Sequence, residues 1–328
     1  MARTTRWLLG AGLLLFIALL ASQGFSEVLQ VLALAGWGLL PVSLFHLVPL
    51  AIDAAGIRVL EPTLRPHATR DALLVRWIGE SANSLLPAGQ IGGPLLMIRQ
   101  FIQRGMPGAN AVAIVTVSTT LQSFAQMVFA LLGLAALGGR LQHVSNAASW
   151  AAIAFASALI VLCIGAFYVL QRRGLFGQLI RLLQRLLRSR DWSDLERYAA
   201  GADAAVTETY QRTVQVWGSF LLNLAGWVAG TAEVWMLLHL LGSPVSWTDA
   251  LALESLGAAI RAAGFAIPGA LGVQEGGYLL LAPLLGLRPE VALAVSLGKR
   301  ARELLLGIPG LIYLHTSEHS LRSRAPSG

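Results

Sequence analysis

The distribution of apolar residues along the chain predicts a bundle of membrane-crossing helices. The uncharged windows long enough to cross about 30 Å of hydrocarbon are 7–26, 28–52, 105–139, 141–171 and 213–232. Lipid offers no hydrogen-bond partners to the backbone, so these windows are expected to be helical. We therefore expect an all-α, polytopic membrane helix bundle that forms one domain over residues 1–328.

The charge content supports this class and predicts an orientation. Only 12% of the residues are charged, whereas soluble domains carry about 25%. The net charge of +7 comes almost wholly from Arg, and Arg residues gather in 53–104 and 172–212. The positive-inside rule then places 53–79, 172–212 and both termini in the cytoplasm. Such basic loops indicate contact with anionic lipid headgroups rather than with nucleic acid. Segment 172–212 is expected to lie on the inner leaflet as an amphipathic helix, or to be a solvated connector.

Two further stretches carry Pro and Gly where a membrane span would need an unbroken helix. Their hinge residues are expected to be Pro87, Gly92, Gly93, Pro268, Gly269, Gly272, Gly276 and Gly277. Pro removes a backbone donor and Gly loosens the backbone. Irregular backbone at membrane depth is tolerated only against protein or a water-filled cavity. Each stretch is therefore predicted to be a re-entrant, broken helical hairpin.

The two hairpins begin segments with the same order of elements. Each is followed by a short helix, a proline and a full span, which defines repeat 1 over about 80–137 and repeat 2 over about 254–314. Counting spans places the two repeats in opposite orientations. An inverted-topology repeat is the build of many secondary transporters, which bind substrate between the repeats. A chance similarity of turns rich in Gly and Pro is the alternative.

Charged residues interrupt the last span, 291–314, about halfway along. They are Lys299, Arg300, Arg302 and Glu303. A charge near the bilayer centre costs about 2.5–3.5 kcal/mol on insertion scales, so these side chains should face a polar cavity or one another. Lys299 and Glu303 share a helix face, and an ion pair between them is the alternative to a binding role.

Other polar residues complete the predicted cavity, in which the cations would bind an anionic headgroup. At the same depth, the span of repeat 1 offers Ser118, Thr119, Thr120, Gln122, Ser123 and Gln126. The remaining candidate substrate-binding residues are Glu80, Asn83, Gln90, Glu254, Arg261, Gln274 and Glu275, while Glu233 is a further charge in apolar surroundings. The amides and hydroxyls would bind headgroup hydroxyls, and a buried carboxylate could carry a proton. The scattered His residues, His46 among them, show no ligand spacing, so neither a metal nor a cofactor is expected. Gly226 and Gly230 could form a helix contact or the face of a homo-oligomer.

The hairpin motifs also carry a resemblance to a known family. ESANSLLPAGQIGG, and IPGALGVQEGGYLLL followed by SLGKRARELLLGIPG, resemble hopanoid-biosynthesis-associated membrane proteins of the HpnL type. These belong to a wider group of flippase-like domains related to the transmembrane part of lysylphosphatidylglycerol synthase. The resemblance covers about residues 5–315 and implies a bacterial inner-membrane protein that moves a polar lipid between leaflets. It singles out motif residues already named here, such as Glu80, Gln90 and Glu275, without assigning roles to them. The large soluble domain of the lysyl-transferring relative has no counterpart, so lysyl transfer is not expected.

A lipid transporter is therefore the leading hypothesis, with a hopanoid or a phospholipid derivative as substrate. One alternative is an intramembrane lipid-modifying transferase that uses Glu80, Glu254 or Glu275 as a general base. A non-catalytic subunit of a lipid-synthesis complex is another. No nucleophile–base pairing or phosphate loop is evident, so an enzyme is not expected. The sequence leaves open the lipid, the direction, the driving force, the oligomeric state and the role of the midplane cations.

Overall fold

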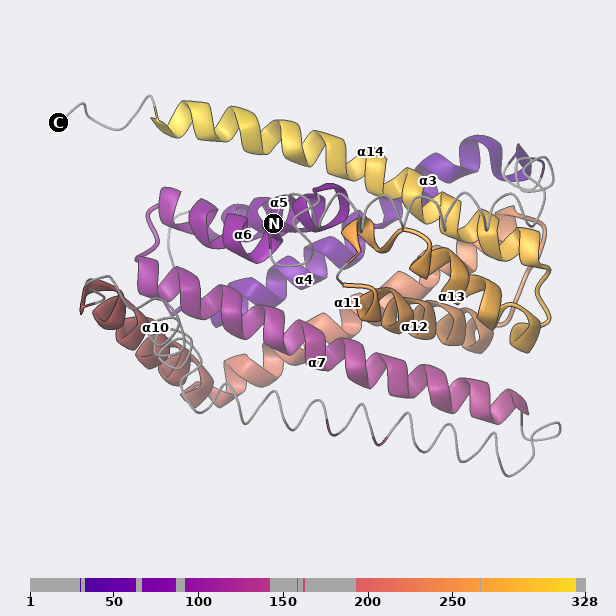
Figure 1. Cartoon of the computed structure of the whole chain (residues 1–328), viewed down its shortest axis with the longest axis horizontal. Helices are drawn as coiled ribbons and strands as arrows, with labels where there is room; N and C mark the ends of the chain where they lie inside the picture. The colour runs from indigo at the N-terminus through magenta and orange to yellow at the C-terminus, as the bar shows by residue number, and fades with distance from the viewer. Residues whose placement is uncertain are drawn as a thin grey trace.

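The computed structural model describes residues 33–62, 67–86, 92–141, 193–265 and 267–322, together with Gln30, Ala158 and Leu162. All regular elements in these ranges are helices, which confirms the all-α class (Figure 1). Among the described residues, three helical segments are long and apolar enough to cross a membrane: Ala33–Leu60, Gly108–Gly139 and Thr213–Leu240. The predicted span 7–26, nearly all of 141–171, the basic stretch 174–190, and the residues Pro87 and Gln90 lie outside the described residues.

The first described span is divided into pieces rather than continuous. It consists of η1 (Gly36–Gly38), α3 (Leu39–Phe45) and α4 (Leu47–Leu60). The joint between α3 and α4 is His46. Pro49 has no backbone N–H, so the carbonyl of Phe45 lacks its usual donor four residues on. The predicted span 28–52 therefore has a joint at His46, in its second half, where the backbone dihedrals remain helical, and α4 continues beyond its predicted end to Leu60.

The interval 53–79, whose cytoplasmic location stays a prediction, is mostly helical rather than an open loop. It contains the end of α4 and most of α5 (Ala68–Leu85). Arg and Asp lowered the apolar content of α5 enough to hide it in the hydropathy pattern. Leu86 is extended (φ −90°, ψ 142°), as expected for a residue that precedes a proline. After the break, α6 (Gly92–Gln103) packs back along α5, and α7 (Gly108–Leu141) follows.

The second half of the described chain has the same order of elements. After α10 (Ser193–Gln211) come α11 (Thr213–Leu240) and α12 (Trp247–Ala263), which breaks into η3 (Pro268–Ala270). The chain continues through α13 (Val273–Leu281) and η4 (Pro283–Leu285) into the long helix α14 (Pro289–Arg322). Two helix–break–helix units are thus present, α5–α6 and α12–α13, each beginning upstream of the boundary that the sequence suggested, and their re-entrant course in the membrane stays a prediction.

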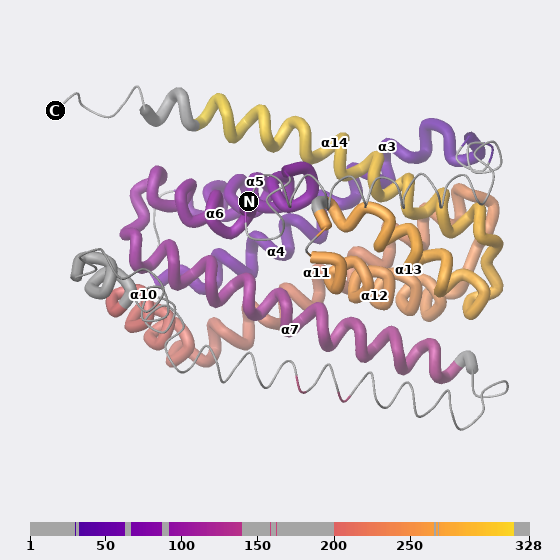
Figure 2. The backbone as a smooth tube through the Cα atoms, in the orientation of Figure 1, coloured from indigo at the N-terminus to yellow at the C-terminus, as the bar shows by residue number. Residues whose placement is uncertain are grey.

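The helices of the two halves pack against one another in a reciprocal pattern. Helix α5 packs against α14, α12 packs against α7, and α4 packs against α11. The long helices α7 and α14 contain 34 residues each and run in opposite directions (Figures 1 and 2). The pattern of helix contacts is approximately unchanged when α4–α7 of the first half are exchanged with α11–α14 of the second half. The orientation of the two halves relative to the membrane remains a prediction.

The second glycine of each Gly-Gly pair lies where the two helices of a hairpin touch. A Cβ atom at Gly93 would lie 2.5 Å from the carbonyl oxygen of Gly79 on α5. At Gly277 it would lie 2.8 Å from Cγ2 of Ile260 on α12. Real Cβ atoms do not approach other heavy atoms this closely. Close helix packing therefore accounts for both glycines.

The apolar core consists of two clusters, one for each half. The first includes Ile57, Phe101 and Ile114 from α4, α6 and α7. The second includes Leu237, Leu253 and Leu293 from α11, α12 and α14, together with the buried ring of Tyr278. The buried charged residues described below belong to neither cluster. They are contributed by helices of both halves.

Candidate functional site

Lys299 is buried against a carboxylate of another helix. Its side chain comes from α14, and the residue is only 6% exposed. Nζ donates to Oε1 and Oε2 of Glu254 on α12 at 2.6 and 2.5 Å. The hydroxyl of Tyr278 donates to the same carboxylate at 3.1 Å. The pair considered from the sequence, Lys299 with Glu303, does not form, because Glu254 projects from the opposing helix into hydrogen-bonding reach of Nζ.

Arg302 joins α14 to α11 and to the joint between α3 and α4. Its Nη1 donates to Oε1 and Oε2 of Glu233 at 2.9 and 2.7 Å. The same nitrogen lies 2.9 Å from Nδ1 of His46. His46 also contacts Glu233, with 3.0 Å between Nδ1 and Oε2, and Glu80 on α5, with 2.6 Å between Nε2 and Oε1. These contacts connect four separate helical segments.

Arg300 holds the break between α12 and α13 in place. Its Nη1 donates to the carbonyl of Gly269 at 2.6 Å, and Nη2 donates to the carbonyl of Ala270 at 3.3 Å. Gly269 has φ 63° and Gly272 has φ 78°, a conformation that glycine adopts without strain. The carboxylate of Glu275 accepts hydrogen bonds from Nε of Arg300 at 3.1 Å and from the N–H of Gly272 at 2.7 Å. Arg300 and Glu275 thereby satisfy backbone groups that a continuous helix would pair internally.

Glu303 is shared between two arginines of repeat 2. It accepts from Nη1 of Arg300 at 3.0 Å and from Nη1 of Arg261 on α12. Arg261 also donates to Oε1 of Gln274 at 2.8 Å. The amide of Gln274 then donates to the hydroxyl of Ser296 at 3.0 Å. These contacts fix the start of α13 between α12 and α14.

Further charged residues, on α4 and α5, extend this set of contacts. Nη2 of Arg76 donates to Oδ2 of Asp53 at 2.8 Å and lies 3.5 Å from Oε2 of Glu80. The amide of Gln122 on α7 donates to the same oxygen of Asp53 at 3.1 Å. Glu80 thereby links the arginine of α5 to His46. Its side chain is 27% exposed, whereas that of Glu275 is fully buried.

One continuous set of ionisable side chains results, which we call the charge network. Its members are Asp53, Glu80, Glu233, Glu275, Glu303, Arg76, Arg261, Arg300, Arg302 and His46. An isolated charge in an apolar interior is strongly unfavourable, whereas a hydrogen-bonded pair is tolerated. Each cation predicted to line an open cavity is instead bonded to a carboxylate. Arg300 is paired with Glu275 and Glu303, and Arg302 is paired with Glu233.

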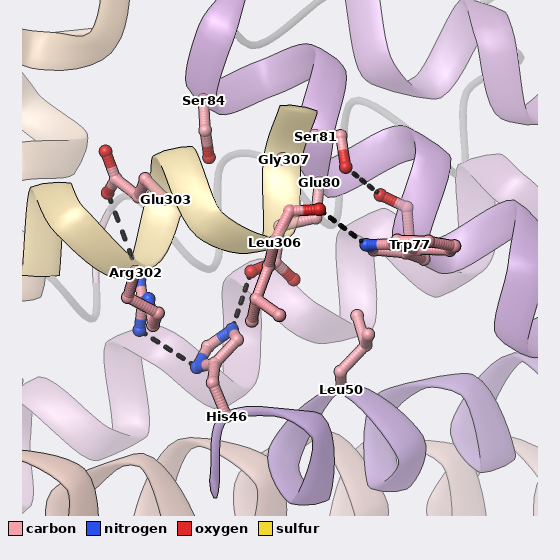
Figure 3. A pocket seen from close by; sticks show the side chains of 10 residues that line it. All are labelled: His46, Leu50, Trp77, Glu80, Ser81, Ser84, Arg302, Glu303, Leu306 and Gly307. Carbon is pink, nitrogen blue, oxygen red and sulfur yellow. Dashed lines mark hydrogen bonds and ion pairs between the residues drawn. The ribbon is translucent and has the colours of Figure 1, made fainter. Parts of the chain in front are cut away.

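A hollow between α5 and α14 reaches the charge network (Figure 3). The hollow is narrow and partly open to the surroundings: its cavity volume is about 20 Å³, enough for about one water molecule. The polar part of its lining includes His46, Glu80, Arg302 and Glu303, and Leu50 and Leu306 supply apolar surface. The remaining lining residues are Trp77, Ser81, Ser84 and Gly307. Of the three midplane cations, Arg302 alone lines this hollow, while Lys299 and Arg300 do not.

Most of the neutral polar residues predicted to bind a headgroup have other partners. The hydroxyls of Thr119, Thr120 and Ser123 donate to backbone carbonyls of their own helix. Gln126 donates to the carbonyl of Ala258, which joins α7 to α12. Asn83 accepts the N–H of Gly93 at 2.9 Å and so fastens α6 to α5.

Gly226 takes part in helix packing within the chain. A Cβ atom there would lie 2.5 Å from Oδ1 of Asp53 and 3.5 Å from the carbonyl oxygen of Pro49. The helix contact that the small-residue spacing suggested therefore forms, between α11 and α4, and the homo-oligomer face stays a prediction.

Sequence reasoning missed three members of the charge network. His46 was set aside because no second histidine stood at ligand spacing. Asp53 was not considered, and Arg76 was counted only among the arginines of 53–104. A signal was available for two of them: His46 is a titratable residue within an uncharged window, and Arg76 precedes Glu80 by one helical turn.

The fold and this site define a class: an integral membrane protein whose broken helices surround buried charges. The family model for the lysylphosphatidylglycerol synthase transmembrane region matches residues 6–310. The chain therefore belongs to this family, whose description relates it to membrane-lipid synthesis or transport. The comparisons with curated proteins and with solved structures found no match.

Proposed function

We propose that the protein moves a polar-headgroup lipid between the leaflets of the bacterial inner membrane, with the hollow between α5 and α14 as its headgroup site. The observation that carries this proposal is the mixed lining of the hollow. Glu80 and Arg302 offer charge at one part, and Leu50 and Leu306 offer apolar surface beside it. A lipid is divided in the same way, into a polar headgroup and an apolar acyl or polycyclic tail.

The exposed side of α14 supports a route for the lipid tail. Leu305 and Ile308, which flank the lining residues Leu306 and Gly307, are 41% and 50% exposed. A tail could remain in contact with this apolar surface while the headgroup occupies the hollow. Only the headgroup would then need a polar path, and the hydrophobic cost of exposing the tail to water would be avoided.

The charge network allows Arg302 to exchange a carboxylate partner for a headgroup, so that its own buried charge stays paired. A phosphate or carboxylate headgroup could replace Glu233 or Glu303 as the partner of Arg302 through charge-assisted hydrogen bonds. A polyol headgroup, as on many hopanoids, could bond the Glu80 carboxylate and the Ser84 hydroxyl. The lining therefore offers hydrogen-bonding groups suited to both substrate types considered from the sequence, the hopanoid and the phospholipid derivative, and α5 and α14 would have to move apart to admit either headgroup.

Two of the three carboxylates considered as general bases are poorly placed for transfer chemistry. Glu254 and Glu275 are buried and bonded to Lys299 and Arg300, whereas a general base must reach the proton that it removes. Glu80, bonded to His46, lines the hollow and is the carboxylate that a transferase would use. We further propose that both termini lie in the cytoplasm, from the distribution of Arg in the sequence. Formation of a homo-oligomer or of a lipid-synthesis complex stays a prediction.

Filling the hollow tests the proposal. We expect Ser84→Phe to slow the movement of fluorescent phosphatidylglycerol and of a fluorescent polyol lipid in proteoliposomes by at least about 10-fold, because the ring would occupy the headgroup space. An impermeant reductant added outside the vesicles quenches only the fluorescent lipid in the outer leaflet. The fraction of fluorescence that it removes over time gives the rate of lipid movement. Ala225→Phe, which adds the same ring on the exposed side of α11, is the matched control.

The two variants must be equally folded for this comparison to decide the matter. Thermal unfolding in detergent establishes this before reconstitution. Equal rates for wild type, Ser84→Phe and Ala225→Phe would overturn the assignment of the hollow. Movement no faster than in protein-free vesicles, with every lipid tried, would overturn transport itself.

A further inference from the structure

His46 has more polar partners than one protonation state of its ring can satisfy. Nε2 lies 2.6 Å from Oε1 of Glu80. Nδ1 lies 3.0 Å from Oε2 of Glu233 and 2.9 Å from Nη1 of Arg302. Carboxylates accept hydrogen bonds, and a guanidinium only donates them. The bond to Glu233 therefore requires a proton on Nδ1, and the bond from Arg302 requires its lone pair.

The two contacts at Nδ1 are thus alternatives that differ by one proton. The neutral ring, with its proton on Nε2, donates to Glu80 and accepts from Arg302. The charged ring donates to Glu80 and to Glu233, and its Nδ1–H then faces the guanidinium of Arg302. Uptake of a proton consequently strengthens the hold on Glu233 and repels Arg302.

The charge balance of the network also points to a proton at this position. Its five carboxylates are Asp53, Glu80, Glu233, Glu275 and Glu303, and its four fixed cations are Arg76, Arg261, Arg300 and Arg302. A charged His46 supplies the missing positive charge. His46 and Glu80 both line the hollow, so a proton can reach the ring from the same side as a headgroup.

We infer that His46 is a proton-binding site whose occupation releases Arg302 toward the hollow and thereby couples proton uptake to the binding of an anionic headgroup. This inference rests on the proposed function, because it assigns the ion that would drive lipid movement. An anionic headgroup would take the place of Glu233 as partner of Arg302. Proton and headgroup then favour each other's binding, and the coupling is reciprocal.

Every element around the ring contributes a charged group to this equilibrium. They are Asp53 on α4, Arg76 and Glu80 on α5, Glu233 on α11, and Arg302 and Glu303 on α14. Lys299 with Glu254 forms the neighbouring pair. His46 itself is the joint between α3 and α4, so a change in its contacts bears on helices of both halves.

Transport under a pH difference tests the coupling. In wild-type proteoliposomes, lowering the pH on the side from which the lipid enters should speed movement of fluorescent phosphatidylglycerol by about 5-fold or more, the usual lower range of coupling between sites. In the His46→Gln variant the ratio of the rates at the two pH values should fall to about 1, whatever its absolute rate. His239→Gln is the matched control, because His239 is exposed and its ring contacts only its own helix. Retention of the full pH response in His46→Gln would overturn the inference.

A second measurement separates this inference from the proposed function. Nitrogen NMR of ¹⁵N-histidine-labelled protein in micelles, with His46→Gln for assignment, reports which ring nitrogens carry a proton. We expect His46 to pass from doubly to singly protonated between about pH 5 and 8. At a fixed pH within that range, short-chain phosphatidylglycerol should convert it back to the doubly protonated form. A ring that does not titrate, or that ignores the lipid, overturns the proton site. If the ring responds to pH and to lipid in protein that moves no lipid, the proton site is supported and only the proposed transport function is refuted.

Discussion

The buried charged side chains are stable because each lies against an oppositely charged one from another helix. Lys299 with Glu254 and Arg302 with Glu233 are two of the buried cation–carboxylate pairs that α14 forms. Removing one partner of such a pair leaves an uncompensated buried charge, which costs about 3–5 kcal/mol, whereas replacing both is often close to neutral. This asymmetry distinguishes a structural pair from a cation held ready for a ligand.

We therefore predict that Lys299→Met lowers the free energy of unfolding by about 3–5 kcal/mol, because Glu254 remains buried without its partner. The double variant Lys299→Met with Glu254→Gln should recover most of this loss. Reversible unfolding in mixed detergent micelles, followed by Trp fluorescence, measures both values. Arg288→Met, which removes an exposed cation just before α14, should change stability by less than about 0.5 kcal/mol. Additive losses in the double variant would contradict the pairing.

At the scale of elements, the two broken hairpins depend on glycine for contact and on polar side chains for the break itself. Gly93 and Gly277 allow the helices of each hairpin to touch. In repeat 2, Arg300 supplies hydrogen bonds to carbonyls that the interrupted helix leaves unpaired. A membrane-embedded break without such partners would be costly, since lipid provides none.

We predict that Gly277→Ala lowers stability by about 1–3 kcal/mol through overpacking against Ile260, and that Gly93→Ala does the same against α5. Gly201→Ala on α10 is the matched control. Nothing lies within 4 Å of its added methyl group, so it should raise stability by about 0.5–1 kcal/mol through helix propensity. Thermal unfolding in detergent, read by intrinsic fluorescence, ranks the three variants. A Gly277→Ala protein as stable as wild type would show that the hairpin is looser than described.

At the scale of the whole molecule, reciprocal packing joins the two halves. Helix α5 of one half packs on α14 of the other, and α12 packs on α7. Within the charge network, the contacts that join the two halves are those of His46 with Glu233 and Arg302. The remaining ion pairs of the network join residues of the same half. A rocking movement of one half against the other would therefore have to exchange the partners of His46, a physical reason to expect that binding and movement are linked.

The predicted opposite orientation of the halves can be tested by labelling. We expect a cysteine in place of Pro107, just before α7, to react with an impermeant maleimide only from the cytoplasm. A cysteine in place of Pro289, at the start of α14, should react only from outside. Both residues are exposed, and Cys163, the single native cysteine, is first replaced by Ala. Whole cells and inside-out vesicles distinguish the two sides. Labelling of both positions from one side would refute an inverted repeat.

Much of the architecture was predictable from local pattern. Apolar windows located α7 and α11, and the residues Pro87, Gly93, Pro268 and Gly277 located the two hairpins, because backbone chemistry acts within a few residues. Helix α5 was not predicted, because its charged residues give it the composition of a loop. The pairing of Arg76 with Asp53 and Glu80, which allows these charges to be buried, is visible only in the structure.

The sequence by itself determined that this protein is an all-helical membrane bundle with charges halfway along its last helix. Only the tertiary structure decided what those charges contact. Lys299 meets Glu254, Arg302 meets Glu233 and His46, and Arg300 holds the broken backbone near Gly269. The physical reason is that hydropathy and helix-breaking are properties of neighbouring residues. The partner of a buried charge is chosen instead by how distant helices pack, and no spacing along the chain records that.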